Sequence, residues 1–394
     1  MENRDPYLTC IVCGMETSSW TPNKIDKERP DWRKMREQNP HQPVIIPASD
    51  LEAVDFIGEE LATLWAAFYR AIIDDPTTNS LFISGINRKG DCTCPGPVIN
   101  DPDKACVFFM PRRRGRAQSR FTDFHPVNMS GYDKNRAAGK RIGYAIHAAC
   151  WLLLDRVIGA DLVTNNLRAF VDTVSAFWKK PANRCSWETE SIWEVGPPEQ
   201  DPQCWYEPDS VGLRKIEEVG ELDEDGYPRE FTKRDIHAPN NPFRIVDIAE
   251  LVGRVALPKQ GEGVDGSFQP NGTSSAIAAI CCLPTDIALL IVDTIYTTRE
   301  FCRARVQDTR NLLRATGWVL PRSYWVARCN PAVVFEVQDL LDSGKAADWA
   351  ALCLGLEELQ LHPDWYCNSG LNHRRKILGF LAEIKEGFAE RLLP

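Results

Sequence analysis

The chain has 394 residues, of which 43% are hydrophobic and 26% are charged. These proportions are typical of a globular protein with a large core, and the length predicts two or three domains. The 46 basic and 55 acidic side chains give a net charge of −9, which argues against nucleic acid as the main partner.

The sequence has neither the pattern of a signal peptide nor an apolar run of the length that a membrane span needs. We therefore expect a protein of the cytoplasm or nucleus with no membrane partner. In those compartments the 14 cysteines are expected to be reduced thiols or metal ligands rather than disulfides.

The first cysteines form a pattern typical of a zinc knuckle. Cys10 and Cys13 are separated by two residues, and Gly14 allows a tight turn. His147 and Cys150 stand three residues apart, a spacing that places both on one face of a helix. We predict that these four residues bind one zinc ion, which is structural because four protein ligands leave no open position. Alternatively, the two cysteines are exposed terminal thiols and His147 and Cys150 are core residues.

A knuckle combined with a ligated helix start resembles a treble-clef zinc finger. The sequences Cys-x-x-Cys-Gly and Gly-Tyr-x-x-His-x-x-Cys-Trp also resemble the N-terminal part of a group of fungal F-box proteins. The two halves enclose a long insertion, residues 14–146. The entropic free energy of closing a loop of n residues grows only as about (3/2)RT ln n, so a long insertion is tolerated. An insertion of this length must, however, carry structure of its own. Residues 1–181 are therefore predicted to form a zinc-linked α+β domain.

Within the insertion, residues 16–48 are predicted to be a long loop. A helix is predicted to follow, because Ser49 and Glu52 form a capping box and apolar residues recur at helical spacing. This stripe comprises Leu51, Val54, Ile57, Leu61, Leu64, Trp65, Phe68 and Ile72. Short strands are predicted at 81–83 and 106–110. A second metal site of Cys92, Cys94, Cys106 and His125 is conceivable, but Cys-x-Cys is poor spacing for a knuckle, so these are expected to be structural or incidental residues.

After an apolar helix from residue 151 and an amphipathic helix over 161–180, residues 182–280 are rich in Trp and Pro and are predicted to be irregular. A segment rich in Gly, Ser and Asn, 261–275, is the clearest linker.

The next segment, 281–328, is predicted to form three short helices. Pro284 and Asp286 suit a helix start, and Ile287, Leu290 and Ile291 follow on one face. Gly317 closes the second helix, and Pro321 opens the third. Three short helices bury little on their own, so we expect exposed apolar surface.

This pattern resembles an F-box, with Leu-Pro-x-Asp-Ile at its start and an aromatic residue near its close. Residues 297–305 depart from it by lengthening the link between the first two helices. The resemblance implies docking to the Skp-type adaptor of a cullin ubiquitin ligase. The implied contact residues are Leu283, Pro284, Ile287, Leu290, Ile291 and Trp325.

The last segment, 329–394, is predicted to be helical, so the fold as a whole is expected to be mainly α. No fixed-period repeat of a known target-binding domain is present. Nor does the sequence contain a phosphate-binding loop, a nucleophile elbow or His-Glu-x-x-His, so no enzyme activity is expected. The chain is therefore predicted to be an F-box-type adaptor for an unknown protein target. The alternative is a structural or interaction protein whose F-box-like helices belong to its own core.

Overall fold

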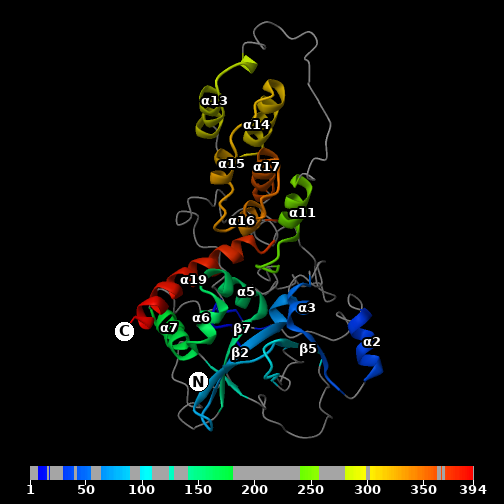
Figure 1. Cartoon of the computed structure of the whole chain (residues 1–394), viewed down its shortest axis with the longest axis vertical. Coiled ribbons are helices and arrows are strands. Elements are labelled where there is room, and N and C mark those ends of the chain that lie inside the picture. Colours follow the sequence, from blue (N-terminus) through cyan, green and yellow to red (C-terminus); the bar gives the residue numbers. More distant parts are fainter. Residues whose placement is uncertain are drawn as a thin grey trace, which may run out of the picture. The chain divides into compact units, whose positions relative to one another are not determined.

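Figure 1 shows the computed structural model of the chain. It describes residues 8–15, 17, 30–39, 42–54, 64–88, 98–108, 124–127, 141–180, 240–256, 280–298, 302–361, 365 and 369–393. Over these residues the structure is mixed α/β with mainly helical content, as predicted. None of the described helices combines the length and apolarity needed to span a bilayer.

The chain divides into two compact units. The described part of the first unit lies within 8–180, 240–244 and 369–393, and that of the second lies within 245–365. The second unit is thus inserted into the sequence of the first. The predicted C-terminal region 329–394 is divided between them, because its last helix belongs to the first unit.

A five-stranded sheet forms the centre of the first unit. Its strands are β2 (Phe68–Asp75), β3 (Ser80–Ile83), β4 (Asn87–Arg88), β6 (His125–Pro126) and β7 (Ile142–His147). β2 pairs antiparallel with β3, β4 and β7, and the short β6 runs parallel to β7. In the central pair, Tyr69 lies opposite His147 and Asp74 lies opposite Ile142. A separate antiparallel pair consists of β1 (Val44–Pro47) and β5 (Lys104–Phe108).

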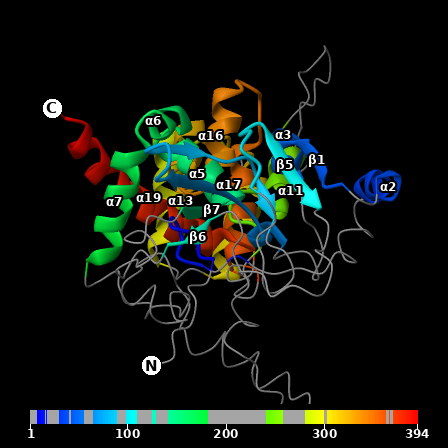
Figure 2. The same cartoon turned by 90° about the horizontal axis from the view of Figure 1, so that it is seen from below.

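Four of the described helices of this unit pack against one another: α5 (Ala148–Val157), α6 (Ala160–Thr164), α7 (Leu167–Lys179) and α19 (Leu371–Leu392). α19 packs along α5 and α7, as both views show (Figures 1 and 2). The rings of Phe170 and Phe388 meet edge to face at 5.7 Å in this contact. The C-terminal helix therefore contributes to the same core as residues far upstream.

A second apolar cluster involves the strands β2 and β7. It contains Leu8, Tyr69, Ala71, Ile73, Phe124 and Ala145. Gly143 of β7 lies directly against Phe124, since a Cβ atom there would come within 2.3 Å of the ring. Any larger residue at this position would displace the aromatic side chain.

The predicted long helix beginning near residue 49 is wrong. α3 ends at Glu52 (Ala48–Glu52), residues 64–67 form one 3₁₀ turn (Leu64–Ala67), and Phe68 begins the strand β2. The first six residues of β2 are all buried, so the strand lacks the apolar–polar alternation that identifies a strand with one exposed face. Phe68 and Ile72, which are four residues apart, also fit the spacing of a helical stripe.

Other predicted elements agree or differ in detail. The strands expected at 81–83 and 106–110 correspond to β3 and β5, although 109–110 lie outside the described residues. The helix predicted over 161–180 is interrupted at Asn165 and Asn166, which separate α6 from α7. The predicted loop 16–48 contains α2 (Pro30–Gln38) and β1. In the predicted irregular segment 182–280, the described residues include the helix α11 (Val246–Val255).

The described part of the second unit is helical apart from an isolated bridge between Ala256 and Ala347. Besides α11 it contains α13 (Thr285–Thr298), α14 (Arg303–Thr316), α15 (Arg322–Arg328), α16 (Phe335–Asp342) and α17 (Trp349–Gln360). α17 contacts α11, α14 and α15, and α13 contacts α14. As predicted, Gly317 ends α14 in the left-handed conformation (φ 68°) and Pro321 precedes α15.

Polar groups join the helices of the second unit. Glu357 of α17 accepts hydrogen bonds from Tyr296 of α13 at 2.9 Å and Arg305 of α14 at 3.2 Å. Asp293 of α13 accepts one from Tyr324 of α15 at 2.9 Å. Burial raises the pKa of both Glu357 and Tyr296. α13 is thus fastened to its unit partly by polar contacts, since its buried residues are only Ala288 and Val292 among those described.

Candidate metal centre

The four predicted metal ligands come together in the first unit. Cys10 and Cys13 lie on one tight turn, in which the Cys10 N–H donates to Met15 O and the Gly14 N–H donates to Cys10 O, each at 2.8 Å. Gly14 has a positive φ of 76°, a conformation that favours glycine. The sequence Cys-x-x-Cys-Gly therefore forms the turn expected of a knuckle.

This turn is attached to the strand that carries the other half of the site. The Ile11 N–H donates to the backbone carbonyl of Ala145 in β7 at 2.8 Å. His147 is the last residue of β7, and Cys150 lies in the first turn of α5. The His147 backbone N–H also donates to Cys10 Sγ at 3.4 Å. A strand end and a helix start thus place an imidazole and a thiol opposite the knuckle.

The ligand atoms have spacings suited to a single ion. All four lie within 4.8 Å of one another. Cys13 Sγ and Cys150 Sγ are 3.4 Å and 3.9 Å from His147 Nδ1. For a tetrahedral zinc site with the usual bond lengths, the ligand atoms are about 3.5–3.8 Å apart. Because all four residues are also 0% exposed, the cluster could hold a buried metal ion.

The three buried thiols of the cluster differ in pKa, because deprotonation of one disfavours deprotonation of the other two. Burial raises the pKa of Cys13 and Cys150, and the neighbouring Cys10 raises both further. Burial also acts to raise the pKa of Cys10, but hydrogen bonds from the other two thiols and the charge of His147 outweigh it, so that pKa is lowered. A bound dication would favour the deprotonated form of all three thiols.

Aromatic and histidine rings surround the imidazole ligand. His147 Nε2 is buried and has no hydrogen-bond partner among the described residues. The ring of Trp65 meets that of His147 at a centroid distance of 5.0 Å and that of His373 at 5.4 Å, both in T-shaped geometry. Burial lowers the pKa of His373, and the nearby His147 lowers it further. The His147 ring thus lies against the ring of Trp65, which is also contacted by His373 of α19.

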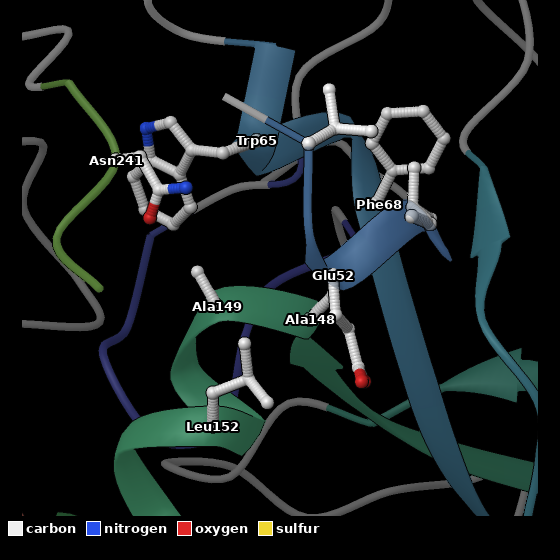
Figure 3. A pocket seen from close by; sticks show the side chains of 9 residues that line it. Glu52, Trp65, Phe68, Ala148, Ala149, Leu152 and Asn241 are labelled. Atoms are coloured by element: carbon white, nitrogen blue, oxygen red, sulfur yellow. The ribbon is translucent and has the colours of Figure 1, made fainter. Parts of the chain in front are cut away.

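Figure 3 shows a small pocket, two of whose lining residues, Ala148 and Ala149, lie between His147 and Cys150 in the sequence. Its lining is mainly apolar and comprises Leu51, Glu52, Val54, Trp65, Phe68, Ala148, Ala149, Leu152 and Asn241. Glu52 accepts a hydrogen bond from Arg70 at 2.9 Å, so its charge is paired. Trp65 belongs both to this pocket and to the surroundings of His147.

Sequence reasoning missed the residues that support the ligands. Trp178 Nε1 donates to Ile11 O at 2.7 Å, although the two residues are 167 positions apart. Trp65 and His373 likewise come from segments distant in the sequence. No local spacing or motif marks such contacts, whereas the ligands themselves are marked by their spacing.

The second metal site, which the sequence disfavours, has no support within the described residues either. Cys92 and Cys94 lie outside them, Cys106 is in β5, and His125 is in β6. Among the residues that the structure describes, the Cys₃His cluster is the only group of candidate metal ligands found.

The predicted partner-binding residues differ in exposure. Leu290 is 62% exposed and Ile287 is 40% exposed, Pro284 is also exposed, and Leu283 and Ile291 are half-buried. Trp325 is only 1% exposed. It therefore packs in the core of the second unit and is not part of the surface. Two further exposed apolar residues, Ile280 and Val319, were not anticipated.

Comparisons with protein-family models, with curated proteins and with solved structures find no match. What the chain does must therefore be inferred from its own residues.

Proposed function

We propose that the chain is an F-box-type adaptor: one structural zinc ion stabilises its first unit, and its second unit docks to the Skp-type component of a cullin ubiquitin ligase. The metal and the docking partner depend on different residues, so each part of the proposal has its own test.

Zinc is the ion that suits the donor set best. Three cysteines and one histidine are soft and borderline donors, which favour zinc over magnesium or calcium. A set of four protein ligands without exposed surface is typical of a structural rather than a catalytic site. When bound, the ion cross-links the knuckle to the end of β7 and the start of α5, which lie far from the knuckle in the sequence.

We expect one zinc per chain in protein purified without chelators, measured by elemental analysis. Cys13→Ala should abolish stoichiometric zinc, since three remaining ligands hold the ion far less tightly. Cys106→Ala is the matched control, because Cys106 is also a buried cysteine but lies in β5 outside the cluster. Zinc-free wild-type protein, or full zinc content in Cys13→Ala, would contradict the assignment.

The docking proposal is carried by the exposed apolar face of α13. The helix follows Leu283 and Pro284 and presents Ile287 and Leu290, while Ala288 and Val292 on its other side are buried. Exposed aliphatic residues grouped on one helix are a feature of protein–protein interfaces. Their position within the F-box-like segment supports the Skp-type component as the partner.

An adaptor needs no catalytic activity of its own. Tethering a target raises the effective concentration of its lysines to roughly millimolar at the ligase. The target remains unidentified, and the first unit is a candidate for its recognition because it is folded around a separate core.

Leu290→Lys should weaken copurification with the Skp-type protein. A central apolar anchor contributes about 2 kcal/mol or more, so affinity should fall roughly thirtyfold. The substitution should leave the fold intact, because the side chain is 62% exposed.

Leu162→Lys is the matched control. Leu162 is another exposed leucine on a helix, 45% exposed in α6 of the first unit, so its substitution should leave binding unchanged. If Leu290→Lys binds as well as the wild type, this face is not the docking surface. The alternative, a protein in which these helices serve only its own core, would then be favoured.

A further inference from the structure

We propose that Trp178 is a positioning residue of the metal centre, which holds the Cys10–Cys13 turn in its ligating geometry through the indole N–H. This inference rests on the proposed metal site and names a residue outside the ligand set on which its affinity depends.

The contact between Trp178 and the turn is direct. Trp178 lies near the end of α7, is 0% exposed, and donates from Nε1 to the carbonyl oxygen of Ile11 at 2.7 Å. Ile11 follows Cys10 and is itself 0% exposed. Its N–H is also used, in the 2.8 Å hydrogen bond to Ala145 of β7. Ile11 is therefore fixed from one side by β7 and from the other by α7.

The indole is held in place by its own neighbours. Its ring lies edge to face against Phe177 at 5.0 Å and against Phe380 of α19 at 5.7 Å. A rigidly packed donor of this kind restricts where the Ile11 carbonyl can lie. The position of the turn is thereby coupled to the packing of α7 and α19.

The two halves of the site differ in how they are supported. His147 and Cys150 are placed by β7 and α5, both regular elements. Cys10 and Cys13 lie on an irregular turn, whose internal hydrogen bonds fix its shape but not its position. Without the indole N–H, the buried Ile11 carbonyl would lose its partner, and the turn could relieve this only by moving. Such a movement would displace the two sulfurs from the ion.

The test uses the full-length protein with Trp178→Phe, which removes the N–H and keeps an aromatic side chain. Zinc affinity is measured by competition with a chromophoric chelator. Outer-shell partners of metal ligands typically change affinity about 10- to 100-fold, and we expect a loss in that range. Cobalt added to saturation should still give the absorption of a Cys₃His site, because the ligands are unchanged.

Trp32→Phe is the matched control, since Trp32 is a buried tryptophan of the same unit that packs in the cluster around β1. It should keep wild-type affinity even if it lowers the denaturation midpoint of the metal-free protein as much as Trp178→Phe does. Equal affinity of Trp178→Phe and wild type would overturn the inference while leaving the metal site itself intact. An equal loss of affinity in both variants would also overturn it, because the effect would then be one of general stability.

If Trp178→Phe does not fold, β-(3-benzothienyl)alanine can replace Trp178. This residue has the shape of tryptophan with sulfur in place of the N–H. The same loss of affinity is expected, and wild-type affinity would overturn the inference. Absence of metal binding by the wild-type protein is a different result, because it would remove the proposed site as well.

Discussion

At the scale of single residues, a buried arginine and a glycine hold together two segments of the first unit, one that precedes the second unit in the sequence and one that follows it. Arg374 of α19 is 0% exposed and donates from Nε and Nη2 to the carbonyls of Pro242 and Phe243, at 2.6 Å and 2.9 Å. Gly370, just before α19, has a φ of 90°. A Cβ atom there would lie 2.7 Å from Asn241 O. The segment 240–244 can approach α19 this closely only because residue 370 has no side chain.

Gly370→Ala should destabilise the protein by about 1–3 kcal/mol, because it combines an unfavourable backbone conformation with a clash against a backbone oxygen. Chemical denaturation of the metal-loaded protein measures this change. Gly379→Ala is the control in the same helix, since nothing lies within 4 Å of its Cβ position. Helix propensity predicts that this control is neutral or slightly stabilising. Equal denaturation midpoints for the two variants would show that the close approach of Gly370 to Asn241 does not contribute to stability.

At the scale of elements, the sequence predicts best what depends on neighbours in the chain. The knuckle, the paired spacing of His147 and Cys150, and the glycine that closes α14 are all local patterns. The structure has the knuckle and the closing glycine as predicted, and it brings His147 and Cys150 together, but His147 ends the strand β7 instead of lying in the helix with Cys150. The helical character predicted for 329–394 likewise agrees with α16, α17 and α19.

The errors arise where burial depends on distant parts of the chain. β2 was predicted as a helix because side chains on both of its faces are buried, and nothing in its own sequence reveals which segments cover them. Trp325 was predicted to contact a partner, yet the other helices of its own unit bury it. The same limitation hides Trp178, whose hydrogen bond to Ile11 joins segments 167 residues apart. Spacing therefore identified the candidate metal ligands, whereas the residues packed around them could be found only from the fold.

At the scale of the whole molecule, the second unit is an insertion rather than an appended domain. Among the described residues, the first unit breaks off after Arg244 and resumes at Ser369, and the second unit lies between them in the sequence. On the side of the first unit, Arg374 and Gly370 hold the exit and return segments against each other. Arg244 adds a further attachment, since it donates to the Ala53 carbonyl at 2.9 Å. Insertions are tolerated where the two connection points are close in the host domain.

This arrangement predicts that residues 245–367 can be replaced by a short Gly-Ser linker without unfolding the first unit. The core of α5, α7 and α19, the sheet and all four metal ligands lie outside the excised segment. The shortened protein should therefore be folded and should retain one zinc, as judged by circular dichroism, gel filtration and elemental analysis. It should also lose the Skp-type partner. Deleting only residues 281–328 is the informative comparison, because it removes α14 and α15, two of the helices that α17 contacts, and leaves buried residues such as Leu352 less covered, so aggregation is expected. If the excised protein were unfolded or free of metal, the first unit would not be independent of its insertion, and the two functions proposed for the chain could not be assigned to separate units.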